Sequence, residues 1–265
     1  MGRARNSLAT PVCGRHDGLV DLLIATLADR PDLAPLLDGF DGAWPEFMRH
    51  DPLSTLYYGD AHEAFAEYVL IAIDRDDADR PVAKGYSAPF SWQRDELPVG
   101  GWDTVLLCAT GDRLAGRRGN RISALEINVR PDLRGKGLSA LMVDAMRRNA
   151  ARLGFDSLVA PVRPSGKHQH PEQPMAEYAA LTRDDGLPVD PWLRVHVRAG
   201  ARIVRVAPRS MTIPGTLDEW RSWTGLPFDV TGPVIVPQAL ARVHCDVAQD
   251  QAIYVEPNVW VEHRV

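Results

Sequence analysis

Arg134-Gly135-Lys136-Gly137-Leu138-Ser139 is the stretch that decides the fold of this 265-residue chain. It lies between an apolar run from Ile122 to Val129 and an amphipathic run from Leu138 to Leu153. This order predicts a strand that turns through glycines into the N-terminus of a helix, where unpaired backbone N–H groups and the helix dipole attract an anion. A phosphate or pyrophosphate is the expected occupant. A turn that only connects the two elements is the alternative.

The residue types of this loop suit an anion site. Gly135 and Gly137 accept a positive φ and carry no Cβ, so the backbone can approach a ligand closely. Arg134 and Lys136 add positive charge, and arginine binds a phosphate through two parallel hydrogen bonds. The spacing matches neither a P-loop nor a Rossmann fingerprint. Apolar residues then recur at helical spacing and predict one buried helix face, ended by Gly154: Leu138, Leu141, Met142, Ala145 and Met146.

The segment from Val129 to Ser139 resembles the acyl-CoA-binding motif of the GNAT superfamily of N-acetyltransferases, which reads Arg/Gln-x-x-Gly-x-Gly/Ala after a strand. Arg134, Gly137 and Ser139 stand at its three fixed places, with serine where glycine or alanine is usual. The resemblance implies an α/β fold with a mixed, mostly antiparallel central sheet flanked by helices. It also implies that acyl-CoA binds to Ile127, Asn128, Val129, Arg134, Gly135, Lys136, Gly137, Leu138 and Ser139.

Elements further along the chain extend the resemblance. Residues 157–162 read as the next strand, and residues 190–201 as a helix that Asp190 caps and Pro191 starts. The superfamily-like core then spans about residues 66–207, with an N-terminal helical extension (13–65) and a C-terminal α/β extension (208–265). Because no segment has the composition of a flexible linker, a single elaborated domain is expected.

Periodicity predicts the remaining elements. Residues 17–27 read as a helix and residues 31–37 as a short second one, while residues 65–73 and 81–92 read as strands. Cys108 falls in an apolar segment that reads as a buried strand. Residues 258–265 read as a final edge strand. The chain is therefore expected to be a monomer, or a homodimer paired through an exposed edge near the C-terminus.

Bulk composition excludes several classes of protein. The chain is 45% hydrophobic and 25% charged, as is typical of a globular protein, and its net charge of −5 provides no basic field for nucleic acid. No stretch is long and apolar enough to span a membrane. Three widely spaced cysteines argue against a disulfide framework, and the polar first residues lack the apolar core of a signal peptide. A cytoplasmic protein is expected.

Two residues are candidates for proton transfer. His196 stands where the superfamily usually has a tyrosine that protonates the leaving thiolate, and histidine titrates near neutrality. The alternative is a histidine packed between helix neighbours. Glu126 shares a strand face with Asn128, opposite Ile127 and Val129, and is the candidate base for the amine. The alternative for Glu126 is a structural ion pair with an arginine.

Three further residues have weaker signals. Tyr178 is a substitute acid in case His196 does not serve. His168 and His170, in the loop after the strand at 157–162, are candidate substrate contacts, and a solvated loop is the alternative. A His-x-His pair without further ligands does not make a metal site, so no metal is expected.

The expected activity is transfer of an acyl group from acyl-CoA to a small primary amine by direct attack, with acetyl-CoA as the expected donor. No residue pattern determines the acyl length. Two alternatives stay open. One is a transferase of the same fold whose acyl group arrives on a carrier protein or a tRNA, and the other is an acyl-CoA-binding module without catalysis.

Overall fold

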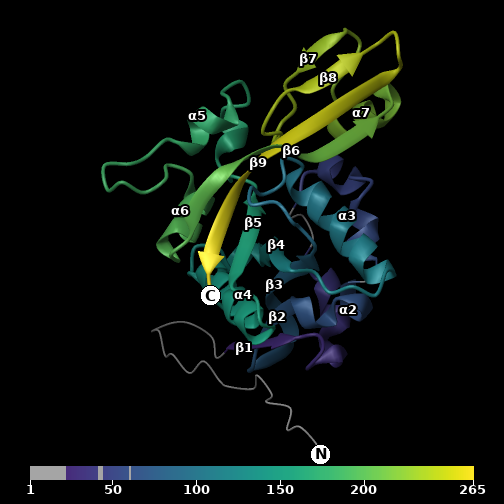
Figure 1. Cartoon of the computed structure of the whole chain (residues 1–265). Coiled ribbons are helices and arrows are strands. Elements are labelled where there is room, and N and C mark those ends of the chain that lie inside the picture. Colours follow the sequence, from purple (N-terminus) through teal and green to yellow (C-terminus); the bar gives the residue numbers. More distant parts are fainter. Residues whose placement is uncertain (1–21, 41–43, 60) are drawn as a thin grey trace, which may run out of the picture.

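A computed structural model describes residues 22–40, 44–59 and 61–265 of the chain (Figure 1). Across these residues one sheet runs in the order β1-β2-β3-β4-β5-β9-β8-β7, and β6 pairs with the other side of β9. All neighbouring strands are antiparallel except β4 and β5, which confirms the expected mixed, mostly antiparallel sheet. The strands are β1 (Leu22–Thr26), β2 (Val69–Asp74), β3 (Asp77–Phe90), β4 (Arg121–Val129), β5 (Ser157–Val162), β6 (Arg202–Gly215), β7 (Gly232–Val234), β8 (Val243–Asp246) and β9 (Gln251–Arg264).

Helices cover both faces of this sheet (Figure 1). On one face, Met142 and Met146 of α4 pack in a core cluster with residues of β4 and β5. On the other face, Trp102 and Val105 of α3 pack in a second cluster with residues of β3. The helices are η1 (Pro31–Asp38), η2 (Glu46–His50), α1 (Ser54–Tyr58), α2 (Ala61–Ala64), η3 (Ala66–Tyr68), α3 (Gly101–Leu114), η4 (Pro131–Leu133), α4 (Leu138–Arg152), η5 (Lys167–Gln169), α5 (Met175–Ala179), α6 (Pro191–Arg198) and α7 (Leu217–Thr224).

The two parallel strands part soon after they begin. β4 pairs with β5 only at Ile122–Leu158 and Ser123–Val159, whereas β5 stays paired with β9 along its length. β4 also has a bulge at Leu125. Glu126 pairs with Tyr86 of β3 and Ala124 pairs with Ser87, so Leu125 between them has no partner in the register. A bulge bends and twists the strand that carries it. From Ala124 onward, the edge of β4 that faces β5 therefore has no strand partner among the described residues.

The helix predicted after the glycine loop is confirmed. α4 runs from Leu138 to Arg152, and Gly154 ends it with φ +80°. The predicted helix at α6 is also confirmed, because the Asp190 carboxylate accepts hydrogen bonds from the backbone N–H groups of Trp192 (2.9 Å) and Leu193 (3.0 Å). Both helices carry their start and stop signals within a few residues of their ends.

The N-terminal helix predicted over 17–27 is wrong where the structure describes it. Residues 22–26 form strand β1, paired antiparallel with β2, and residues 17–21 lie outside the described residues. In a segment this short, the apolar residues suit a strand as well as a helix. The unpaired edge of β2 supplies the hydrogen bonds that decide between them.

Two further predictions are wrong, one in the central part of the chain and one at its C-terminal end. Cys108 lies in helix α3 and is half-buried, not in a buried strand. Residues 258–265 are not an edge strand, because β9 is flanked by β6 on one side and by β5 and β8 on the other. This segment therefore offers no free edge to a second subunit. The core assigned to 66–207 omits β1 and β9 of the sheet, and the single-domain organisation stays a prediction.

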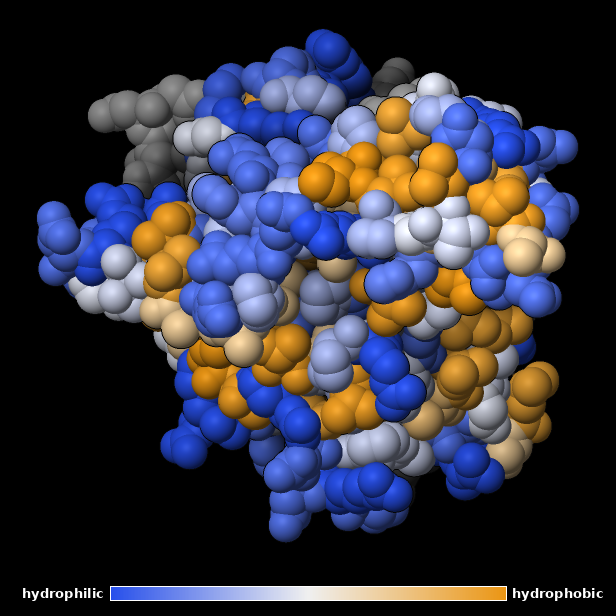
Figure 2. All heavy atoms as spheres, turned by 90° about the horizontal axis from the view of Figure 1, so that it is seen from above, coloured by the Kyte–Doolittle hydropathy of each residue, from blue (hydrophilic) through white to orange (hydrophobic). Residues whose placement is uncertain are grey.

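Seen from above, apolar residues reach the surface in several separate patches among hydrophilic ones (Figure 2). Exposed large hydrophobic residues include Val230 and Ile235, in the C-terminal part of the chain. Scattered apolar side chains are normal on a protein surface. Such residues do not mark a functional site.

Candidate active site

The glycine loop has the geometry of an anion cradle. Gly135 and Gly137 both have φ +79°, and a Cβ added at either position would meet no atom within 4 Å. The backbone conformation therefore favours glycine here, while the space beside the loop is open. Among the described residues, the backbone N–H groups of residues 135–139 have no hydrogen-bond partner, and the first bond of the helix runs from Ala140 N to Gly137 O (3.1 Å). These amides are available to a ligand.

Two basic side chains flank the cradle. Arg134 and Lys136 are exposed, and neither forms an ion pair within the described ranges. Arg130, by contrast, is held by Asp132, with 2.7 Å between Nε and Oδ1. Arg134 and Lys136 therefore keep their charge for an anion at the start of α4, where the helix dipole adds to the attraction.

Glu126 lies beside a group of aromatic side chains, called the aromatic wall here: Tyr58, Tyr86 and Trp102. As expected, Glu126 and Asn128 share one face of β4, and Val129 packs into the opposite core with α4. Glu126 is half-buried and stands directly across from Tyr86, whose ring centroid lies 4.9 Å from that of Tyr58. Burial, and after it the neighbouring Glu126 carboxylate, raise the pKa of the Tyr58 hydroxyl well above its usual range. Tyr58 therefore stays a neutral hydrogen-bond donor beside Glu126.

Two carboxyl groups near this wall, those of Asp51 and Asp103, were not predicted by any sequence pattern. Asp51 precedes α1 and Asp103 lies in the first turn of α3, and each has one buried carboxylate oxygen without a hydrogen-bond partner. Burial raises the pKa of Asp51 to about 6, with a smaller contribution from Glu256. Burial and then Asp51 raise the pKa of Asp103 to about 8. No motif surrounds these aspartates or Tyr58 in the sequence, because segments far apart in the chain bring them to the site.

His196 is enclosed in the core. Its Nδ1 lies 2.9 Å from Nε2 of His263 in β9, its Nε2 has no partner, and its ring centroid is 4.4 Å from the ring of Trp192. Burial, followed by His263, lowers the pKa of His196, and burial followed by Arg147 lowers the pKa of His263. Two neutral, mutually bonded rings fit the packed-histidine alternative. The role of His196 as an acid stays a prediction.

This histidine pair is expected to make the protein sensitive to acid. An unfolded histidine binds a proton near pH 6.5. Since the folded state keeps both rings neutral below that pH, the pair contributes stability that is present above about pH 6.5 and is lost as the pH falls toward the lowered folded pKa values. Each ring removes up to about 1.4 kcal/mol per pH unit in that window.

Urea unfolding of the parent and of His196→Phe, at a series of pH values below neutrality, isolates this contribution. Asp51 and Asp103, whose pKa values are raised, act in the opposite direction in both proteins and cancel in the comparison. The unfolding free energy of His196→Phe should depend less steeply on pH. His244→Asn, at an exposed histidine, should leave the slope unchanged. Equal slopes in the parent and His196→Phe would contradict the expectation.

The other predicted site residues lie in the segment between β5 and α6. The buried Tyr178 hydroxyl donates to Asp190 (3.0 Å), and burial followed by Asp190 raises the pKa of Tyr178. His168 Nδ1 lies 2.9 Å from the carbonyl oxygen of Ser165, and the carbonyl of His170 accepts from Lys167 Nζ (2.6 Å). The catalytic or substrate-binding roles of Tyr178, His168 and His170 stay predictions.

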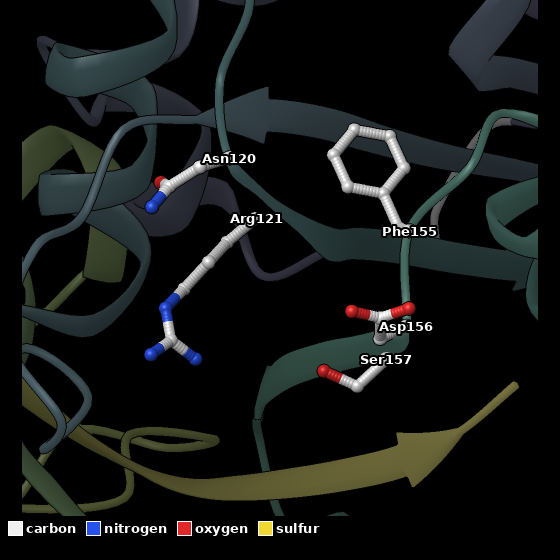
Figure 3. Close-up of a pocket in the computed structure, with 5 residues that line it drawn as sticks. All are labelled: Asn120, Arg121, Phe155, Asp156 and Ser157. Atoms are coloured by element: carbon white, nitrogen blue, oxygen red, sulfur yellow. The ribbon is translucent and has the colours of Figure 1, made fainter.

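A shallow hollow at the opposite end of β4 and β5 does not belong to this site (Figure 3). Asn120, Arg121, Phe155, Asp156 and Ser157 line it, where the two strands begin and are still paired. Within the described ranges, no group of three or more histidine, cysteine or carboxylate side chains is placed to hold a metal ion. None of the helices in the described ranges has the length and apolar character needed to cross a membrane.

Comparison with known proteins identifies the family. No family model matches the chain. It is 35% identical over 273 residues to arginine N-acetyltransferase avaD from Aspergillus versicolor, an alignment that covers 91% of this chain and 93% of that protein. The loading GNATL domain of CurA from Lyngbya majuscula has the same fold, with a TM-score of 0.58 at 20% identity over 93% of this chain and 98% of that one. With the anion cradle before α4 and the parted strands beside it, these similarities establish that the chain belongs to the GNAT superfamily, as an enzyme that transfers an acyl group to an amine.

Proposed function

We propose that the protein acetylates an amine of arginine, or of a closely related guanidino compound, with acetyl-CoA as the donor. The observation that carries this proposal is the 35% identity, over nine-tenths of the chain, to an arginine N-acetyltransferase. A donor on a carrier protein or a tRNA is not favoured, because the exposed cradle suits a free coenzyme. The cytoplasmic location and the choice between monomer and homodimer stay predictions.

The residues present fit a coenzyme. The unpartnered amides of residues 135–139, together with Arg134 and Lys136, would hold the pyrophosphate at the start of α4. Residues 127–129, at the strand edge that β5 leaves free, would hydrogen-bond the amides of the pantetheine arm as an added strand does. Bound acetyl-CoA supplies the thioester, whose acyl carbon is the electrophile.

Glu126 then acts on the acceptor. An ammonium has no lone pair, so it must lose a proton before it attacks the thioester. We assign this proton to the Glu126 carboxylate, directly or through one water. The C–N bond forms as the C–S bond breaks, the nitrogen releases its second proton to solvent, and the thiolate takes up a proton from solvent. Holding amine and thioester together in the opening between β4 and β5 supplies much of the remaining acceleration.

Coenzyme binding is expected to raise the melting temperature of the protein. A ligand at 100 times its dissociation constant adds about 2.7 kcal/mol of stability, which corresponds to a shift of roughly 5–10 °C for a chain of this size. A thermal-shift assay with CoA and acetyl-CoA measures it. Acetyl-pantetheine, which lacks the pyrophosphate, should shift the protein far less. No shift with either coenzyme would contradict the proposed donor.

Turnover tests the acceptor separately. Mass spectrometry of a reaction with acetyl-CoA and arginine should show one acetyl group added to arginine. If the protein instead acetylates only amines without a guanidino group, the proposed acceptor is wrong while the proposed donor stands.

A further inference from the structure

Three carboxyl groups from distant parts of the chain lie close together near the aromatic wall. Asp51 precedes α1, Asp103 begins α3, and Glu256 lies in the middle of β9. Phe47, four residues before Asp51, packs on Tyr254 with 5.4 Å between ring centroids, and the Tyr254 hydroxyl donates to Glu256. Trp102, the neighbour of Asp103, donates its backbone N–H to Ser210 of β6, and the next residue, Met211, is the register partner of Glu256. The electrostatic effects of Glu256 on Asp51, and of both on Asp103, agree with this placement. An acidic cluster alone is not a site, so the partners of each carboxylate decide what it can do.

Glu256 is fully partnered. It is completely buried and accepts hydrogen bonds from Arg163 Nε (2.9 Å), the Tyr254 hydroxyl (2.9 Å) and Asn258 Nδ2 (3.0 Å). Arg163 also donates to the carbonyl of Gln238 (2.5 Å). The one arginine of this cluster is therefore already paired with Glu256. Its charge does not compensate the other two carboxylates.

Among the described residues, no cationic side chain forms an ion pair with Asp51 or Asp103. Asp51 is only 3% exposed, and while its Oδ1 accepts from Leu53 N (2.8 Å), its Oδ2 has no partner. Oδ1 of Asp103 is buried and unpartnered too, although the residue as a whole is partly exposed. A buried carboxylate oxygen without a donor costs free energy. Two such oxygens in one cluster, one of them on a residue that reaches the surface, indicate a missing cationic partner.

Aromatic side chains connect the surroundings of this cluster with those of Glu126. Trp102 immediately precedes Asp103, and its ring stacks on that of Tyr58 with 6.3 Å between centroids. The Glu126 carboxylate raises the pKa of Tyr58, after burial, as it does those of Tyr57 and Tyr86. The start of α3 is held in place by a hydrogen bond from Trp102 N to Ser210 Oγ (2.9 Å). A substrate with an amine near Glu126 and a cation at the end of a flexible chain would reach both groups.

We propose that Asp51 and Asp103 bind the guanidinium group of the acceptor and thereby direct its amine to Glu126. This inference rests on the proposed arginine acetylation and names the residues that recognise the side chain. A guanidinium is planar and has five N–H donors, so it satisfies two carboxylates at once, whereas an ammonium is a point charge. The charge of Glu256 is compensated by Arg163, so Glu256 lines the site and does not bind the guanidinium.

Steady-state kinetics of Asp103→Asn tests this assignment. With arginine, kcat/KM should fall about 10- to 100-fold, mainly through KM, because a charge-assisted hydrogen bond is lost. With citrulline, whose side chain ends in a neutral ureido group of similar shape, the variant should differ little from the parent. Asp51→Asn should show the same selectivity. Asp144→Asn, at a partly exposed aspartate paired with Arg148 on α4, is the matched control and should leave the kinetics with both substrates unaffected.

Melting temperatures without substrate distinguish binding from a structural role. If Asp103 serves substrate binding, Asp103→Asn removes a buried carboxyl group with an unpartnered oxygen and should leave the melting temperature unchanged or higher. A lower melting temperature with equal losses for arginine and citrulline would show a structural role and overturn the proposal.

Binding measured without turnover keeps this inference separate from the proposed function. Calorimetric titration of arginine into the protein loaded with CoA should detect binding in the parent and at least tenfold weaker binding in Asp103→Asn. If arginine binds in this way but is not acetylated, the proposed function fails and the guanidinium site stands. If arginine is acetylated and both aspartate variants keep its KM, the guanidinium site is overturned and the proposed function stands. Absence of arginine binding in the parent overturns the site as well.

Discussion

Glu126→Gln is expected to lower kcat by about 10²- to 10⁴-fold at neutral pH, the range that a positioned general base contributes. Glutamine keeps the shape of the side chain and its hydrogen-bond acceptor, but it cannot take a proton from the attacking ammonium. KM for acetyl-CoA should stay near that of the parent, because the cradle and the free edge of β4 are untouched. Because Glu126 is half-buried beside Tyr58 and Tyr86, water has limited access and does not easily take over its role as the base.

The pH profile provides the sharpest readout for this variant. As the pH rises, more of the amine is neutral without a base, so the deficit of Glu126→Gln should shrink. Glu177→Gln, at an exposed glutamate on α5, is the matched control and should follow the parent at every pH. A Glu126→Gln enzyme within threefold of the parent at neutral pH would show that another group, or solvent, takes the proton.

Gly137→Val is expected to weaken acetyl-CoA binding by about 100-fold or more, because two or more hydrogen bonds from the amides of the cradle to the charged pyrophosphate are lost. Gly137 has φ +79°, which costs an L-residue roughly 1–2 kcal/mol. A side chain there would meet no protein atom, so it would project into the open space where the pyrophosphate is expected. Valine therefore both shifts the backbone and occupies the anion site.

A second glycine separates the two effects. Gly186 has φ +74° and likewise no atom near an added Cβ, but it lies in a turn between Arg183 and Leu187, outside the cradle. Gly186→Val should lose similar stability and keep acetyl-CoA binding, measured by calorimetric titration. Equal coenzyme affinity in Gly137→Val and the parent would remove the glycine loop from the binding site.

Elements whose signals are short in range could be predicted from the sequence. β4, the glycine loop and α4 follow one another between residues 121 and 152, and α6 carries its cap at Asp190 and its starting proline at Pro191. Here turn residues, caps and hydrophobic period agree within one or two turns of the chain, so local preference suffices. The same patterns placed Glu126 and Asn128 on one face of β4. From these elements the superfamily, and with it the reaction, was recognisable.

Contacts between distant segments decided the rest. The segment from Leu22 to Thr26 is a strand because β2 has an edge to pair with. The pKa of His196 is lowered by burial and, after it, by His263, which lies 67 residues later in the chain. Asp51, Asp103 and Glu256 carry no motif, and they meet because η2, which precedes Asp51, packs on β9 and the start of α3 is bonded to β6, the neighbour of β9. Local sequence sets the dihedral preferences of a segment, but burial, and with it pKa and the need for a partner, depends on which other segments fold over it.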